Sequence, residues 1–203
     1  MKLIMFDMDG TLINSGNAIV NTINHVRNKT GLKAISKDYI LENINDPNIN
    51  SSEFFYGTQQ FTQEQTCLFD DYYNVNCLND IVLYDGIKKL IEDLNGSCKL
   101  AVATNASSVF AKKMLTHLDL HHHFDMLLGY NDVQNPKPHP EMLHKIMNKL
   151  DTKKEKSILI GDSRKDSQAA SNAGIDSILV NWGFSNHKDD AIDNVKQLSD
   201  MLL

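Results

Sequence analysis

The sequence has few of the features that mark secreted proteins, membrane-bound proteins or proteins stabilised by a structural metal ion. Only three cysteines occur in 203 residues, and their odd number and spacing suit neither a complete disulfide framework nor a zinc or redox pair. No apolar run is long enough to span a bilayer, and the N-terminal residues show no small-residue cleavage pattern. We therefore expect a soluble protein of a reducing, cytoplasmic compartment, with no membrane partner.

Positive charge is also scarce. Twenty Lys and Arg residues stand against 26 Asp and Glu residues, the net charge is -6, and no basic stretch is interleaved with aromatic residues. Nucleic acid is therefore not an expected partner, and a small anionic substrate would need local positive charge or a metal ion. The chain has no internal repeat, and its length suits one substantial core plus a small inserted unit.

An apolar run that ends in two aspartates and a glycine opens the chain. Residues 2–6 are too few for helical periodicity and predict a buried strand. Asp7 and Asp9 follow, and on an extended backbone they would begin on the same face, where two like charges need a cation or a proton. An acidic turn that caps the next helix is the alternative, although it explains one aspartate better than the pair.

Short apolar runs alternate with helical patterns after residue 80. The predicted strands are residues 99–104, 124–128, 157–162 and 175–180. The predicted helices are residues 87–94, 107–118, 141–150, 166–173 and a C-terminal helix from about residue 189. This alternation predicts an α/β fold with a Rossmann-like parallel sheet, covered by helices on both faces and joined by right-handed crossovers.

The segment between the first strand and this alternation carries only helical patterns. They predict helices over residues 15–29, with Ser15 as N-cap, over 36–43 and over about 51–73, with an Asn-rich turn at 43–50. The domain prediction is an α/β core of residues 1–13 and 81–203 with an inserted all-helical cap of residues 14–80. We expect the cap to close over the site about hinges near residues 13–16 and 83–86.

Polar residues suited to phosphate and metal follow three of the predicted strands. They are Asp7 and Asp9, Thr104 and Asn105, and Asp162 and Ser163. Because ligands bind outside the carboxyl ends of parallel strands, we expect these side chains to meet at one edge of the sheet. Thr104 and Asn105 precede a helix, where they would hold phosphate oxygens or serve only as a helix cap.

Lys137 lies in a loop that contains three of the four prolines of the chain. The prolines stiffen this loop, so the lysine would bring a fixed point charge to a phosphate group. A solvated surface lysine is the alternative. The order of the motifs along the chain favours the phosphate contact.

Four motifs, taken together, resemble those of the haloacid dehalogenase-like (HAD) superfamily. They are Phe6-Asp7-Met8-Asp9-Gly10-Thr11-Leu12, Thr104-Asn105, Lys137 in a Lys-Pro-His-Pro context, and Gly161-Asp162-Ser163-Arg164-Lys165-Asp166. The resemblance covers the chain in order, and the helical insertion stands where that superfamily has its helical type 1 cap. It implies a twisted parallel sheet and a phosphoric monoester hydrolase similar to phosphoglycolate phosphatases.

The resemblance also implies the roles of the site residues. Asp7 would be the nucleophile that forms an aspartyl-phosphate, and Mg²⁺ would be held by Asp7, the backbone carbonyl of Asp9 and the side chain of Asp162. Asp9 would be the general acid and then the base, with a pKa raised by neighbouring carboxylates. Lys137 would offset the repulsion between the nucleophile and the phosphate.

The residues around these groups have supporting roles in this interpretation. Thr104, Asn105 and Lys137 would bind the substrate phosphate. Asp166 would orient Lys137 or a metal-bound water, and Ser163 would contact such a water or cap a helix.

The expected partner is a small phosphorylated metabolite, and the expected state is a monomer or homodimer. The basic residues of the cap, Arg27, Lys29, Lys33 and Lys37, all lie early in it, so a second negative group on the substrate has no obvious partner. Alternatives are a sugar phosphate mutase resembling beta-phosphoglucomutase, a pyrophosphatase or a nucleotidase. The mutase family has a histidine where this chain has Ile19. A non-catalytic binding protein is a further alternative.

Overall fold

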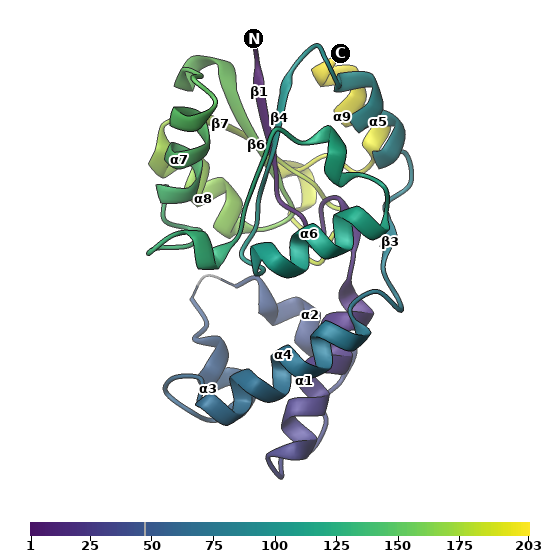
Figure 1. Cartoon of the computed structure of the whole chain (residues 1–203), viewed down its shortest axis with the longest axis vertical. Coiled ribbons are helices and arrows are strands. Elements are labelled where there is room, and N and C mark those ends of the chain that lie inside the picture. The colour runs from purple at the N-terminus through teal and green to yellow at the C-terminus, as the bar shows by residue number, and fades with distance from the viewer. Residues whose placement is uncertain (47) are drawn as a thin grey trace.

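A parallel sheet carries the acidic N-terminal motif on its central strand. The computed structural model describes residues 1–46 and 48–203, and within them the sheet has the strand order β5-β4-β1-β6-β7 (Figure 1). The strands are β1 (Leu3–Phe6), β4 (Lys99–Ala103), β5 (Met126–Leu128), β6 (Ser157–Gly161) and β7 (Asp176–Leu179). The predicted strands and the α/β fold class are confirmed.

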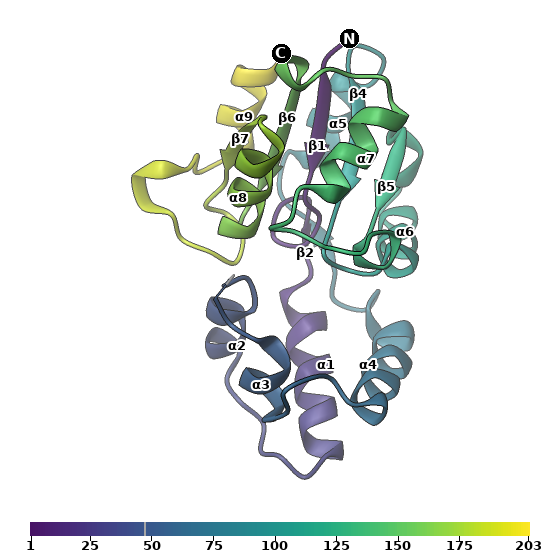
Figure 2. The same cartoon turned by 90° about the vertical axis from the view of Figure 1, so that its left-hand side faces the viewer.

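Two layers of helices bury the sheet on both faces. Side chains of β1 alternate, so that Leu3 and Met5 join one apolar cluster while Ile4 and Phe6 join another. The first cluster is covered by α7 (Glu141–Lys149) and α8 (Arg164–Ala173), and the second by α5 (Ile87–Leu94), α6 (Ser108–His117) and α9 (Val195–Leu202) (Figure 2). Burial on both faces explains why β1 reads as a continuous apolar run.

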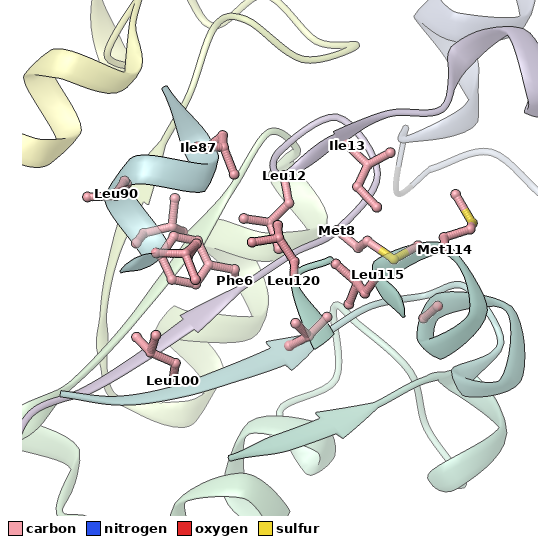
Figure 3. Packing of buried hydrophobic residues seen from close by; sticks show 14 of the residues in the cluster. Phe6, Met8, Leu12, Ile13, Ile87, Leu90, Leu100, Met114, Leu115 and Leu120 are labelled. Atoms are coloured by element: carbon pink, nitrogen blue, oxygen red, sulfur yellow. The ribbon is translucent and has the colours of Figure 1, made fainter. Parts of the chain in front are cut away.

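The loop after β1 is anchored by apolar side chains that flank its aspartates. Met8 and Leu12 are fully buried in the same cluster as Phe6 and Leu115 (Figure 3). Between them Gly10 adopts a φ of 84°, a left-handed conformation that glycine reaches without strain. The backbone of the acidic loop is therefore held in place from both sides.

The described part of the segment between the first strand and the rest of the core forms four helices, where the sequence predicts three. They are α1 (Gly16–Lys29), α2 (Lys37–Ile44), α3 (Ser51–Tyr56) and α4 (Gln63–Asn76). They pack around an apolar cluster of their own beyond one end of the sheet (Figures 1 and 2). We call residues 14–80 the helical insertion.

A short two-stranded ribbon joins the helical insertion to the core. Strand β2 (Ile13–Asn14) pairs antiparallel with β3 (Val82–Leu83), and Ile13 lies opposite Leu83. The ribbon occupies the two segments where the hinges are predicted. The division into two domains and the hinge motion stay predictions.

Two predicted helices differ from the structure. The helix predicted over residues 51–73 is two helices, because Gly57 ends α3 in a left-handed conformation and Thr62 begins α4 with a capping box to Gln65. The C-terminal helix begins at Val195 rather than near residue 189, because the Asn194 side chain accepts a hydrogen bond from the backbone N–H of Gln197 and caps it there.

Short 3-10 turns lie between several of the helices and strands. The 3-10 turns are η1 (His121–His123), η2 (Tyr130–Asp132), η3 (Lys154–Lys156) and η4 (Lys188–Asp190). Within the predicted turn at residues 43–50, Pro47 lies outside the described residues. No helix in the described ranges has the length and apolar character needed to cross a membrane.

Candidate active site

Lys137 forms the centre of a buried ion-pair network. Its ammonium Nζ lies 2.7 Å from Oδ1 of Asp7 and 2.5 Å from Oδ1 of Asp166. All three side chains are at most 10% exposed. The lysine is therefore not the solvated surface residue that the sequence left open as an alternative.

The strand ends converge here as the topology predicts. Asp7 follows β1, and its backbone N–H donates to the carbonyl of Ile160 on the neighbouring strand β6 at 2.8 Å. Asp162 follows β6 directly. Thr104 follows β4, the neighbour of β1 on its other side, and is buried. Parallel pairing thus brings three strand ends to one edge of the sheet.

Asn105 clamps the loop that carries Lys137. Its Oδ1 accepts a hydrogen bond from the backbone N–H of Lys137 at 3.0 Å, and its Nδ2 donates to the backbone carbonyl of Lys137 at 2.8 Å. Both polar atoms of the Asn105 amide are therefore used by Lys137. In this structure the Asn105 side chain therefore contacts the backbone of Lys137, whereas the sequence predicted that Asn105 binds the substrate phosphate. The buried hydroxyl of Thr104 accepts from the backbone N–H of Ala106 at 3.0 Å.

Asp166 is held by the start of helix α8. Its Oδ2 accepts hydrogen bonds from the backbone N–H of Ser163 at 3.1 Å and from the Ser163 hydroxyl at 2.6 Å, which forms a capping box. Its other oxygen faces Lys137. Ser163 is the N-cap residue of α8, and Asp166 contacts Lys137 directly, as an orienting role would require; the roles predicted for both residues stay predictions.

Asp162 sits in a tightly fitted position. A Cβ atom added at Gly10 or at Gly183 would overlap with the Asp162 side chain, so both glycines are required by close approach. One carboxylate oxygen accepts from the backbone N–H of Phe184 at 2.7 Å, and the Asn45 amide lies 3.4 Å from both oxygens. No ion pair to Asp162 forms within the described part of the chain.

Asp9 is bonded to the first turn of the helical insertion. Its Oδ1 accepts a short hydrogen bond from the hydroxyl of Ser15, the residue before α1. Ser15 stands at the predicted N-cap position, but its side chain makes no capping bond. Burial raises the pKa of Asp9 to about 6, while the Ser15 hydrogen bond opposes the rise. The predicted cause, repulsion from neighbouring carboxylates, is therefore wrong; desolvation is the main cause.

The remaining carboxylates repel one another in a dry environment. Burial, only partly offset by Lys137, raises the pKa of Asp7 to about 7, and the charge of Asp166 adds to the rise. Burial and the charges of Asp7 and Asp166 raise the pKa of Asp162 well above its ordinary value. The pKa of Lys137 is also raised, because the two carboxylates outweigh the opposing effect of burial. The cluster has more buried negative charge than Lys137 compensates.

These residues suit a hard divalent cation. One oxygen from each of Asp7, Asp162 and Asp166 lies within 4.8 Å of the others. All the donors are oxygens, the ligand type that magnesium prefers, and the uncompensated charge would be neutralised by a cation. Both carboxylate oxygens of Asp166 already accept hydrogen bonds, whereas only Oδ1 of Asp7 does so in the described part of the chain, so Asp7 and Asp162 are better placed than Asp166 to bind a metal.

A cavity of about 550 Å³ lies between this cluster and the helical insertion. Its lining includes the polar core residues Asp7, Asp9, Thr104, Lys137 and Ser163, and we call the part that they form the carboxylate end. It also includes Tyr56, Phe61, Phe69, Tyr73 and Phe110, and we call the part that they form the aromatic end. The volume falls in the range of small-molecule sites.

The structure adds site residues that sequence reasoning did not identify. Ser15 contacts Asp9, and Asn45 and Phe184 contact Asp162. Lys165 lines the cavity and donates to the carbonyl of Ile44 in the helical insertion at 3.1 Å. For Asn45 and Phe184 the sequence carries no signal, because they come from segments far from the motif in the chain.

The chain belongs to the haloacid dehalogenase-like hydrolase family, whose model matches residues 4–180. The family predicted from the motifs is thereby confirmed, and the chain is a hydrolase of that family. A phosphoglycolate phosphatase of Colwellia psychrerythraea is 27% identical over 198 residues, which cover 93% of this chain and 88% of that relative.

Other relatives share this architecture. Pyrophosphatase PpaX of Halalkalibacterium halodurans is 29% identical over 185 residues, covering 91% of this chain and 85% of that protein. The crystal structure of a predicted phosphoglycolate phosphatase from Haemophilus somnus is 25% identical, has a TM-score of 0.86 and covers 100% of this chain and 98% of that chain. The relatives therefore match both the sheet and the helical insertion.

Proposed function

We propose that this protein hydrolyses a small phosphate monoester in a magnesium-dependent reaction with an aspartyl-phosphate intermediate on Asp7. The observation that carries the proposal is the buried Asp7 carboxylate, paired with Lys137 at 2.7 Å and lining a cavity with Asp9. The phosphatases among its relatives support the same chemistry.

In the first half of the proposed reaction, Asp7 attacks the phosphorus atom. A carboxylate oxygen of Asp7 forms a bond to phosphorus while the bond to the ester oxygen breaks. Asp9 donates its proton to that oxygen, so that the leaving group departs as a neutral alcohol. Its pKa of about 6 lets part of the population hold that proton near neutral pH.

In the second half, water releases the phosphate. Asp9, now ionised, takes a proton from the water as its oxygen attacks phosphorus, and the bond to Asp7 breaks. Lys137 keeps its charge beside Asp7 throughout and attracts the phosphate oxygens. Asp7, Asp162 and the backbone carbonyl of Asp9 would hold Mg²⁺, which when bound offsets the repulsion between carboxylates and phosphate.

The helical insertion acts as the cap in this proposal. It contributes one wall of the cavity and reaches the core through Ser15, Asn45 and the carbonyl of Ile44. A closed cap excludes bulk water and brings its lining residues to the leaving group. A small phosphorylated metabolite as substrate, a cytoplasmic location and a monomeric or homodimeric state belong to the same proposal.

Hydrolysis is favoured over phosphoryl transfer between sugar positions. Ile19 and Ile23 line the cavity from α1, where the mutase interpretation requires a histidine. The nearby His25 instead stacks on Tyr72, with ring centroids 4.2 Å apart. Pyrophosphate is retained as a test substrate because a relative is named a pyrophosphatase.

The experiment is an assay of phosphate release after purification with EDTA. Phosphate monoesters and pyrophosphate are supplied with and without Mg²⁺, to the wild type, to Asp7→Asn and to a control, Asp151→Asn, whose carboxylate is exposed. We expect magnesium-dependent release that falls by about 10⁴-fold or more in Asp7→Asn, as for loss of a nucleophile, and is unchanged in the control. Release that persists in Asp7→Asn, or no release from any compound, would refute the proposal.

A further inference from the structure

The aromatic end of the cavity is built from rings of both the insertion and the core. Phe69 and Tyr73 of α4 are stacked with centroids 5.4 Å apart, and Phe110 of α6 meets Tyr73 edge-on at 5.1 Å. The Tyr73 hydroxyl contacts the Met114 sulfur at 3.6 Å. Tyr73 is buried in the main apolar cluster, with its polar tip against the core, and it also forms part of the lining of the cavity. We call Phe69, Tyr73 and Phe110 the aromatic trio.

The lining of the same cavity carries few positive charges, and they are already engaged. Among the described residues that line it, the cations are Lys137 and Lys165. Lys137 is held between Asp7 and Asp166, and Lys165 donates to the carbonyl of Ile44. Neither lysine comes from the helices that carry the aromatic trio.

The early basic residues of the insertion do not change this balance. Arg27, Lys29, Lys33 and Lys37 are absent from the described lining of the cavity. Arg27 instead donates to the backbone carbonyls of Lys33 and Phe55, and Lys37 to the side chain of Asn17. The lining does contain Asp70, on the same helix as Phe69. Lys113, on the same helix as Phe110, donates to the backbone carbonyl and side chain of Asn74 and is not among the lining residues. On the helices that carry the trio, the charged side chain that lines the cavity is therefore Asp70.

We propose that the preferred substrate is a phosphate monoester of an uncharged, largely apolar alcohol, best with an aromatic ring, and that the aromatic trio binds this group. The inference rests on the proposed phosphatase activity. Apolar and aromatic walls favour a buried ring through removal of its surface from water and through ring packing. A second carboxylate or phosphate beside these rings would lose hydration, and the lining residues on the helices that carry the rings include Asp70 but no cation.

The substrate preference expected here differs from that of a phosphatase for phosphoglycolate. Phosphoglycolate places a carboxylate where benzyl phosphate has a phenyl ring, so the two esters differ at the position in question. Ethyl phosphate has neither group. We expect kcat/KM to fall in the order benzyl phosphate, ethyl phosphate, phosphoglycolate, with at least about a tenfold difference between the first and the last.

Two variants distinguish a role of Phe69 in substrate recognition from a role in packing alone. Phe69→Ala should lower kcat/KM for benzyl phosphate by about tenfold or more while changing that for ethyl phosphate little, since only the ring contact is lost. Phe54→Ala is the matched control, because Phe54 stacks on Tyr39 in the insertion and is not among the lining residues. Equal losses with both esters in Phe69→Ala would show a merely structural role and overturn the assignment.

A gain of charge provides the converse test. Thr66 is exposed and lines the cavity, so Thr66→Arg adds a cation without burying it in the protein core. We expect this variant to raise kcat/KM for phosphoglycolate relative to benzyl phosphate by about tenfold. An unchanged ratio would contradict the explanation by charge.

A binding measurement keeps the two proposals separable. Calorimetric titration with 2-phenylethylphosphonate and 3-phosphonopropionate, in the presence of Mg²⁺, compares a ring with a carboxylate in compounds that cannot be hydrolysed. We expect the phenyl compound to bind at least about tenfold more tightly. If no ester is hydrolysed, the phosphatase proposal fails and this ratio still tests the cavity. If phosphoglycolate is the better ester, or if benzyl and ethyl phosphate are equal, only the substrate inference fails.

Discussion

The two ends of the cavity are built by opposite means. At the carboxylate end, Lys137 and Asp166 are buried, and the side chains of Lys137, Asp166 and Asn105 all have fixed hydrogen-bond partners. At the aromatic end, the rings meet through non-directional contacts and some are open to solvent, as in Phe61, which is 55% exposed. The polar network around Lys137 is thus held by many directional contacts, whereas the aromatic walls are held by few. In the proposed function, the reacting groups and the groups that select the substrate would therefore respond differently to substitution.

The largest effect should come from breaking the ion-pair network. Lys137→Met leaves the carboxylates of Asp7 and Asp166 buried without their cation, and we expect a loss of about 3–5 kcal/mol in the free energy of unfolding without Mg²⁺. Urea denaturation measures it. The loss should shrink at low pH, where the carboxylates become protonated. A cost under about 1 kcal/mol would show that the network does not constrain the folded state.

A smaller effect is expected from disturbing the fit around Asp162. Gly183→Ala adds a Cβ that overlaps with Asp162 and with the carbonyl of Gly10. We expect a loss of stability of about 1–3 kcal/mol from overpacking, together with about tenfold weaker Mg²⁺ binding, because Asp162, the proposed metal ligand, is displaced. Thermal unfolding at increasing Mg²⁺ concentration measures both. Ser185→Ala in the same loop is the control, and wild-type metal affinity in Gly183→Ala would contradict the argument.

At the aromatic end, truncation should cost little stability. Phe61→Ala removes a side chain that is more than half exposed, so we expect a change within about 0.5 kcal/mol in the free energy of unfolding. The same urea titration used for Lys137→Met provides the comparison. A loss at Phe61 as large as that at Lys137 would remove the distinction between the two ends.

The smallest expected effect concerns Glu141, a carboxylate whose surroundings stabilise its ionised form. Glu141 accepts hydrogen bonds from the backbone N–H groups of Gln134 and Asn135, which with Lys145 lower its pKa to about 2. A lowered folded-state pKa stabilises the fold above the ordinary value near 4.5, and this contribution disappears as pH falls through about 2. Glu141→Gln should therefore lower the melting temperature slightly at pH 7 and progressively less below pH 4.5. A difference that is independent of pH would exclude the charge as its cause.

Much of the fold was predictable because its signals are local. The run ending at Phe6 and the later apolar runs have the length and composition of buried strands, and each forms a strand of the sheet. The motif residues after the strands were predictable as neighbours, because parallel strands bring their carboxyl ends to one edge. The break at Gly57 and the Thr62–Gln65 capping box were also visible, but the aromatic periodicity of the segment obscured them.

The contacts between distant segments were not predictable. Ser15 suits an N-cap equally well, so its bond to Asp9 has no distinct signature in the sequence. Asn105 was assigned to phosphate because a strand end before a helix suits an anion, while its clamp on Lys137 depends on the path of a loop 32 residues away. The burial that raises the pKa of Asp9 likewise depends on tertiary packing.

The β2–β3 ribbon makes the helical insertion an exchangeable cassette. The chain departs from the core at Ile13 and returns at Leu83, its partner across the ribbon, so the two ends of the intervening segment meet at one place. Segments with adjacent ends can be lengthened, shortened or replaced without altering the scaffold that receives them. Grafting another insertion between these two residues would leave the sheet and the network of Asp7, Lys137 and Asp166 intact, because these belong to the core, whereas the contacts of Ser15 and Asn45 would have to be supplied anew.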